Sequence, residues 1–257
     1  MFRGQAVAVV VPAFNEADKI EATLAGMPAF VDHVLVVDDG SRDQTAERVR
    51  AQADRRVEVR VHDRNRGVGA AIGSGYARAL ELGCDVVAVM AGDGQMDPAD
   101  LPGLLAPVVE GRADYAKGNR LAWPGGWREM PAVRLAGSLA LSWLTGVATG
   151  YDGLRDSQCG YTAVSRAALV AVGPEQIYPR YGYPNDLLAR LAGVGARVVD
   201  VPVRPVYGAA WRSGLRPSRV VIPVGRILAR AFAARLRRRG PAPRTIVAEP
   251  SSCASAS

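Results

Sequence analysis

Five short runs of apolar, mostly β-branched residues recur along the chain. They cover residues 6–11, 33–37, 57–61, 86–90 and 196–201. Runs of this length that are apolar on both faces are typical of strands in a parallel sheet covered by helices. The pattern therefore predicts at least five buried strands.

Helical patterns separate the first four of these runs, over residues 16–27, 44–53 and 69–82. In the first of them Ile20, Leu24 and Met27 recur at the spacing of one helix face. Repeated strand-helix-strand order predicts an α/β fold, with a Rossmann-like, mostly parallel sheet flanked by helices in a single domain.

The residues that follow each of the first four runs are acidic or rich in glycine. They read Pro12-Ala13-Phe14-Asn15-Glu16, Asp38-Asp39-Gly40-Ser41, Asn65-Arg66-Gly67-Val68-Gly69 and Asp93-Gly94-Gln95-Met96-Asp97-Pro98. Ligands of parallel sheets bind beyond the carboxyl ends of the strands. These loops are therefore expected to meet at one edge and to form the functional site.

The glycines after the third run, Gly67, Gly69 and Gly73, are not expected to bind a dinucleotide. Such a fingerprint follows the first strand, and an acid lies about twenty residues further on, whereas Met90 and Ala91 stand there. Close packing of a helix and room beside a ligand explain these glycines better. His33 and His62, which have no partner at ligand or triad spacing, are interpreted as structural.

The formal net charge of +7 is concentrated near the C-terminus. Nine arginines stand there without an acid among them, which leaves the rest of the chain at 7 − 9 = −2: Arg216, Arg219, Arg226, Arg230, Arg235, Arg237, Arg238, Arg239 and Arg244. We expect residues 216–239 to form a basic amphipathic helix, broken or kinked near Pro223, whose part from 224 to 239 binds an anionic membrane surface. A helix packed on the domain with solvated arginines is the alternative.

The ends and the cysteines suggest a cytoplasmic protein. Three widely spaced cysteines indicate neither a disulfide framework nor a zinc site. No window of 18 uncharged apolar residues predicts a membrane-spanning helix, so any membrane contact is expected to be peripheral, at the inner face of the cell membrane. Residues 240–257, rich in Pro, Ala and Ser, are expected to be a disordered tail, and no nucleic acid is expected to bind.

Several motifs resemble family 2 glycosyltransferases in order and spacing. Residues 9–16, 36–41 and 93–98 carry the likeness, which is greatest to the dolichol-phosphate mannosyltransferase group and its bacterial polyprenyl-phosphate relatives. The strings Asp156-Ser157-Gln158-Cys159-Gly160-Tyr161 and Tyr181-Gly182-Tyr183-Pro184-Asn185-Asp186 resemble later motifs of that group. The match covers about residues 7–214, and residues 1–215 are expected to form the catalytic domain.

The resemblance implies a GT-A type fold and an inverting hexosyltransferase. Such an enzyme moves a hexose from a GDP- or UDP-sugar to a polyprenyl phosphate. Two alternatives remain open: an enzyme of the same fold that acts on a soluble small-molecule or natural-product acceptor, and a nucleotide-sugar binding protein with weak or no catalysis. The sequence does not identify the sugar or the nucleotide.

The resemblance also implies a donor site and a metal site. The donor residues are Pro12, Phe14, Glu16, Asp39, Ala91, Gly92, Asp93 and Arg212. Asp39 is implied to accept hydrogens from the base, while Asp38 holds its loop. Asp93 and Gln95 are implied to contact Mg²⁺ or Mn²⁺. Ala91 replaces the first acid of the family's Asp-x-Asp motif, which leaves the metal dependence open.

On the acceptor side, the resemblance implies that Arg120 and Arg134 bind phosphate and that Asp156 positions the sugar or the acceptor. With Asp93, Arg120 and Asp156 form the expected catalytic set. An acceptor phosphate is already anionic, so its attack on the sugar needs alignment rather than a protein base. An exposed salt bridge explains Arg134 equally well. Asp186 lies near the acceptor or caps a helix over residues 186–192.

Overall fold

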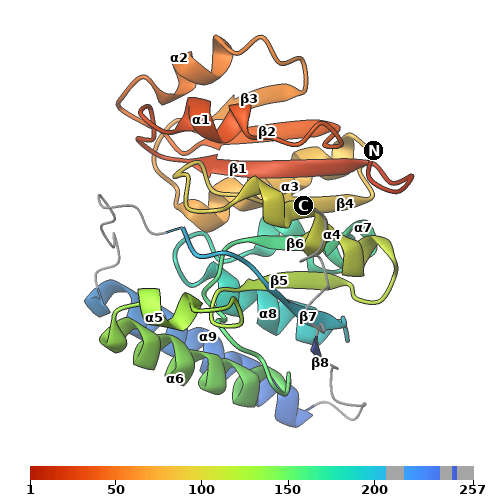
Figure 1. Ribbon diagram of the computed structural model, residues 1–257. Coiled ribbons are helices and arrows are strands. Elements are labelled where there is room, and N and C mark those ends of the chain that lie inside the picture. Colours follow the sequence, from red (N-terminus) through yellow and green to blue (C-terminus); the bar gives the residue numbers. More distant parts are fainter. Residues whose placement is uncertain (207–216, 238–244, 248–257) are drawn as a thin grey trace.

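The computed structural model describes residues 1–206, 217–237 and 245–247, and it contains an eight-stranded sheet between helices (Figure 1). The strand order is β3-β2-β1-β4-β6-β5-β7-β8, and within the described residues β6 alone runs antiparallel to its neighbours. The predicted mostly parallel α/β sheet is confirmed. The strands are β1 (Val7–Ala13), β2 (His33–Asp38), β3 (Val57–Val61), β4 (Val86–Val89), β5 (Tyr115–Asn119), β6 (Thr162–Ser165), β7 (Val198–Pro202) and β8 (Thr245–Val247).

Helices bury an apolar core on each face of this sheet. One core packs under α1 (Ile20–Ala25), α2 (Thr45–Arg50) and α4 (Leu101–Val109), and the other under α3 (Val68–Glu81), α7 (Arg166–Val172) and α8 (Tyr183–Gly193). Two long helices, α6 (Ala132–Thr149) and α9 (Pro217–Arg237), contact each other and α8, and they lie at the lower end of the molecule in Figure 1. The remaining short elements are η1 (Pro98–Asp100), α5 (Gly126–Glu129) and η2 (Pro174–Gln176).

The five predicted strands are present, but β5 and β6 did not follow from the apolar pattern. β5 carries Lys117 at its centre, and this side chain is only 1% exposed because its ammonium pairs with Asp200 of β7 at 2.9 Å. A lysine in a run of only five residues makes the run look exposed. The carboxylate that neutralises it lies 83 positions away, so the sequence pattern does not show that the strand is buried. β6 has only four residues, which is too short for a periodic signal.

Several predicted helix boundaries also differ. Around Arg134 the chain forms two helices, α5 and α6, which are separated at Pro131. The helix predicted over 186–192 begins at Tyr183, so Asp186 lies within its first turn and is not its cap. Instead, the Asp186 carboxylate accepts the Tyr178 backbone N–H at 2.9 Å and pairs with Arg190 at 2.8 Å.

At the C-terminal end, Pro223 does not break α9, which excludes the first of the two expected effects of this proline. The helix continues through Pro223, because Val224 and Ile227 on the next turns are buried against the domain, which offsets the lost backbone hydrogen bond. Within the segment 240–257, predicted to be a disordered tail, β8 pairs with β7. That part of the prediction was wrong, and the rest of the segment lies outside the described residues.

The prediction that no helix could span a membrane also needs correction. Among the described residues, α6 is long and apolar enough to do so, and 22% of it is buried. Its one charged residue, Arg134, is in the first turn, where a long side chain can reach beyond an apolar layer. Length and composition alone do not separate such a helix from a core helix of a soluble protein.

The glycines before and within α3 serve close packing, as predicted. A Cβ on Gly69 would lie 2.0 Å from the carbonyl oxygen of Tyr178, and one on Gly67 would lie 2.4 Å from that of Pro179. Gly67 also has a φ of 105°, which other residues rarely adopt. The start of α3 therefore fits against the segment that precedes α8 only because these side chains are absent.

We predict that Gly69→Ala lowers the free energy of unfolding by about 1–3 kcal/mol, because the backbone around Tyr178 must move to admit the methyl group. Gly103→Ala in α4 is the matched control, since its new Cβ meets no atom within 4 Å. This control should be neutral or stabilising by about 0.5–1 kcal/mol. Urea denaturation of both variants measures the difference, and equal stabilities would contradict the packing argument.

Candidate active site

The loops after β1 and β2 are joined by hydrogen bonds between their backbones and side chains. The Asn15 N–H donates to Ser41 Oγ at 2.9 Å, and the Arg42 N–H donates to Asn15 Oδ1 at 2.9 Å. Buried Asp38 accepts both the N–H and the hydroxyl of Ser41, at 2.9 and 2.5 Å. Asp38 therefore orders the loop rather than facing a ligand.

A cavity of about 280 Å³ opens at the carboxyl ends of β1, β2 and β4. It is lined by seven of the eight residues expected to hold the donor: Pro12, Phe14, Glu16, Asp39, Ala91, Gly92 and Asp93. We call it the donor cavity. The eighth, Arg212, lies outside the described residues.

Asp39 is almost fully buried at the base of the donor cavity and is held by three donors. Its carboxylate accepts the backbone N–H groups of Arg66 and Gly67, at 2.9 and 2.7 Å. It also lies 2.7 Å from Nδ1 of His62, whose Nε2 lies 2.9 Å from Ser74 Oγ of α3. His62 was interpreted as structural, and it supports Asp39 in this way through partners that lie 23 and 12 positions away in the sequence.

A concentration of negative charge marks the mouth of the same cavity. Burial raises the pKa of Glu16 above its usual value, Lys19 opposes this rise, and the nearby carboxylates of Asp93 and Asp43 add to it. The Asp93 carboxylate accepts the backbone N–H of Gln95 at 3.0 Å. Carboxylates this close favour a ligand that brings a cation or hydroxyl hydrogens to them.

A smaller cavity adjoins the donor cavity, and Asp93 lines both. Arg120 and Gln95 line this second space together with the 159–161 segment. We call it the acceptor cavity, after the role expected of Arg120. The structure thus brings the expected catalytic arginine and the expected metal ligands to one place.

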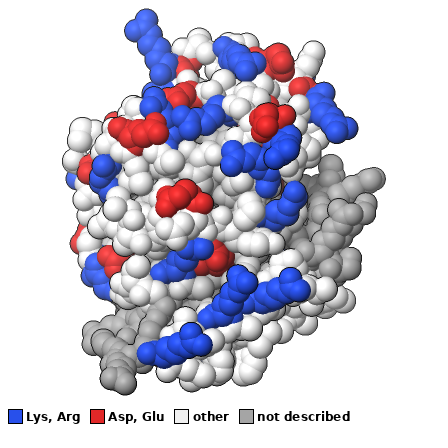
Figure 2. Space-filling view, turned by 180° about the vertical axis from the view of Figure 1, so that it is seen from behind, with Lys and Arg blue, Asp and Glu red and all other residues white. Residues whose placement is uncertain are grey.

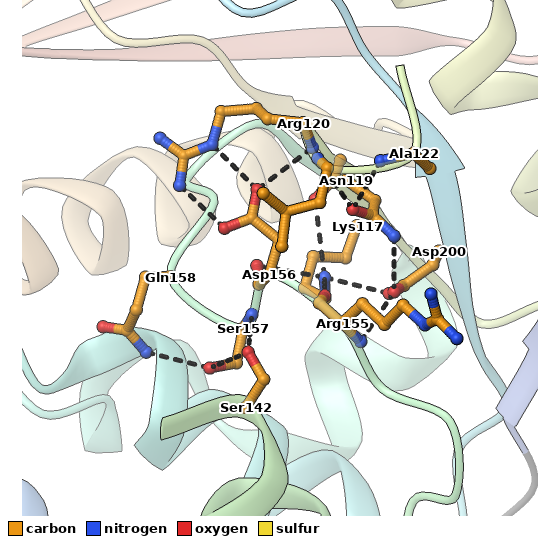
Figure 3. A network of polar contacts seen from close by, with 12 residues as sticks. Lys117, Asn119, Arg120, Ala122, Ser142, Arg155, Asp156, Ser157, Gln158 and Asp200 are labelled. Atoms are coloured by element: carbon orange, nitrogen blue, oxygen red, sulfur yellow. Dashed lines mark hydrogen bonds and ion pairs between the residues drawn. The ribbon is translucent and has the colours of Figure 1, made fainter. Parts of the chain in front are cut away.

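Asp156 lies behind Arg120 and has no exposed surface (Figure 3). Its two carboxylate oxygens accept Nε and Nη2 of Arg120 at 2.8 and 2.7 Å, and the Arg120 backbone N–H adds a third bond of 3.0 Å. Burial acts to raise the pKa of Asp156, but the hydrogen bonds and charge of Arg120 outweigh it, and the pKa is lowered. Asp156 therefore remains ionised and orients Arg120.

A second buried ion pair, Lys117 with Asp200, lies beside Asp156 (Figure 3). Besides pairing with Asp200, the Lys117 ammonium donates to the carbonyl oxygens of Arg155 and of Asp156, the latter at 3.2 Å. Asp200 also accepts the Arg155 N–H at 2.8 Å and the Asn119 amide at 3.2 Å. Burial raises the pKa of Asp200 against the opposing charge of Lys117.

The sequence also missed residues of the site. Asn65, Arg180 and Tyr181 line the donor cavity. Asn65 and Tyr181 stand in noted motifs, whereas Arg180 had no signal beyond its place beside Tyr181. Arg134, expected at the acceptor phosphate, is half-buried in the first turn of α6 and lines neither cavity.

Comparison with known proteins agrees with this geometry. Residues 8–173 match the model of the family described as Glycosyl transferase family 2. The chain is 28% identical over 214 residues to the UDP-N-acetylglucosamine–dolichyl-phosphate N-acetylglucosaminyltransferase of Methanococcus voltae, covering 77% of this chain and 85% of that protein. It is 34% identical over 202 residues to the undecaprenyl-phosphate mannosyltransferase of Micrococcus luteus, covering 77% and 82%.

Among solved structures, the glucosyl-3-phosphoglycerate synthase of Mycobacterium tuberculosis in complex with Mn²⁺, uridine diphosphate and glucosyl-3-phosphoglycerate has a similar fold. The TM-score is 0.59 at 25% identity, and the alignment covers 91% of this chain and 79% of that one.

We predict that His62→Ala weakens binding of UDP or GDP several-fold, because Asp39 loses one of the donors that fix its carboxylate. Asp39→Ala should weaken both nucleotides more strongly. His33→Ala is the matched control, since His33 lies at the amino end of β2, whereas the donor cavity lies at the carboxyl end of that strand. Titration calorimetry checks the order, and a His62 variant that binds as tightly as the His33 variant would refute it.

Proposed function

The chain belongs to glycosyltransferase family 2, and we propose that it transfers a hexose, with inversion, from a nucleotide diphosphate sugar to a polyprenyl phosphate. One observation carries the proposal: Asp93 borders both the donor cavity and the cavity that contains Arg120. A donor whose base lies at Asp39 and whose diphosphate reaches Asp93 would present its sugar toward Arg120. The named activities of the relatives support a lipid phosphate as acceptor.

The residues fit a divalent metal that arrives with the donor. Within the described residues, no group of three or more His, Cys, Asp or Glu is placed to hold a metal alone. Mg²⁺ at phosphate sites is commonly held by one or two carboxylates together with substrate phosphates and water. Asp93 supplies one carboxylate at the cavity, and Gln95 stands beside it. Such an ion stabilises the negative charge on the leaving diphosphate.

The protein's own groups then bind and align the reactants. Asp39 receives the base, and its neighbours Pro12 and Phe14 border the ring. Arg120, oriented by Asp156, binds the acceptor phosphate through its guanidinium. The acceptor oxygen is anionic before it attacks the sugar carbon, the bond to the diphosphate breaks on the opposite side, and no side chain needs to remove a proton.

We further propose that the protein acts at the inner face of the cell membrane. The acceptor is a lipid, and α9 carries Arg226, Arg230, Arg235 and Arg237 on exposed positions. Arginines near an anionic lipid surface attract it by about 1 kcal/mol each.

The proposed function predicts metal-dependent transfer to a polyprenyl phosphate and none to the free polyprenol. Asp93→Ala should reduce transfer by at least about a hundredfold and remove the response to Mn²⁺. Asp63→Ala, which removes an exposed carboxylate outside both cavities, is the control. Radiolabelled UDP- and GDP-sugars with lipid extraction provide the measurement. Transfer to a soluble acceptor with no lipid product would instead support the alternative enzyme.

Ala91→Asp should tighten Mn²⁺ binding in the presence of UDP, because position 91 lines the donor cavity two residues before Asp93. A second carboxylate gives the ion one more ligand. Ala99→Asp, which adds the same charge in η1, is the control. A Mn²⁺ titration that does not change would show that this loop presents residue 91 away from the metal.

A further inference from the structure

Helix α6 exposes its apolar side chains to solvent. Along one face Val133 is 89% exposed, Leu139 47%, Trp143 67% and Leu144 46%. These positions recur at the spacing of one helix face, which also includes exposed Ala136, Ala140 and Val147. A soluble monomer rarely leaves such a continuous apolar face uncovered.

The opposite face of α6 is polar and turns toward the protein. Its buried residues include Ser138, Ser142, Thr145 and Thr149. Ser142 Oγ accepts the Ser157 backbone N–H at 2.9 Å, and Thr145 Oγ1 accepts the Asn185 amide at 2.7 Å. The helix thus buries its polar face and exposes its apolar face, which is the reverse of a surface helix in an ordinary soluble domain. Ser142 on the polar face contacts Ser157, next to Asp156 (Figure 3).

Helix α9 extends the apolar face. Exposed Val221, Ile222, Phe232 and Leu236 form a stripe at helical spacing. Beside the stripe, Arg226, Arg230 and Arg237 recur on one side of the helix. Arg235 lies on the other side and donates a hydrogen bond to the carbonyl oxygen of Val147 in α6. Figure 2 shows basic side chains gathered at this lower end of the molecule.

We propose that the outer faces of α6 and α9 form a docking surface for an anionic lipid bilayer, in which α6 supplies the main apolar contact. We name it the lipid face: the exposed apolar residues of α6 and α9, with Arg226, Arg230 and Arg237 at its edge. This inference rests on the proposed function and adds to it an element, α6, that carries no cluster of charges.

The charge pattern favours lipid over a second copy of the chain. A row of arginines beside an apolar surface matches phosphate headgroups above acyl chains, whereas two copies of the lipid face would bring like charges together. The helix lies along the bilayer and does not cross it, because its polar face is hydrogen-bonded to the domain by Ser142 and Thr145. Docking therefore holds the Asp156 to Ser157 segment close to the membrane.

Vesicle flotation of the full chain tests the proposal without donor or acceptor, so its failure is separate from failure of the proposed function. Trp143→Glu should weaken binding to both phosphatidylcholine and phosphatidylglycerol vesicles by about tenfold or more, because an apolar contact is lost. Val133→Glu, at a position that is 89% exposed, should act in the same direction without disturbing packing. Val170→Glu in α7, 60% exposed, is the matched control and should bind like the parent.

The arginines at the edge of the lipid face should affect binding only when the lipid is anionic. The double variant Arg226→Gln, Arg230→Gln should lose about tenfold in binding to phosphatidylglycerol vesicles and nothing in binding to neutral ones. Circular dichroism confirms that each variant is folded. A parent chain that does not float, or α6 variants that float like Val170→Glu, would overturn the proposal. So would light scattering that shows a dimer in the parent and a monomer in Trp143→Glu, with no vesicle binding by either.

Discussion

Asp156 has no contact with solvent, and its carboxylate is matched edge to edge by the guanidinium of Arg120. Removing one member of a buried pair of this kind typically costs about 3–5 kcal/mol, because the other charge is left without compensation. Asp156 also adopts a φ of 48°, a left-handed conformation uncommon for residues other than glycine. This contact orients the Arg120 guanidinium, which lines the acceptor cavity.

A second pair, Lys117 with Asp200, lies beside the first and is joined to it by the bond from the Lys117 ammonium to the carbonyl oxygen of Asp156. Lys117 and Asp200 bring β5 and β7 together and satisfy the carbonyl and amide groups of the segment that ends at Asp156. Each buried charge would be costly alone, but within the network each has both an opposite charge and hydrogen-bond partners. The donor side is built differently: Asp39 is held mainly by backbone N–H groups of the loop after β3.

These two modes of construction explain what the sequence could predict. The donor side follows the ends of consecutive strands, so local motifs located Asp39 and Asp93. The acceptor side depends on residues 36 to 83 positions apart, such as Arg120 with Asp156 and Lys117 with Asp200. The orientation of α6 did not follow from the sequence, because its serines and threonines pack inward against hydrogen-bond partners from distant segments, such as Ser157 and Asn185.

The pairing of β8 with β7 has a consequence for the proposed membrane contact. Because α9 lies between these two neighbouring strands in the chain, it is a crossover connection of the sheet itself and not an appended arm. Among the described residues α9 also contacts α6 and α8, so it is packed as part of the domain. Under the proposal that the lipid face binds a bilayer, the domain would hold Arg120 at a set height above the acyl chains and would select acceptors by the height of their phosphate.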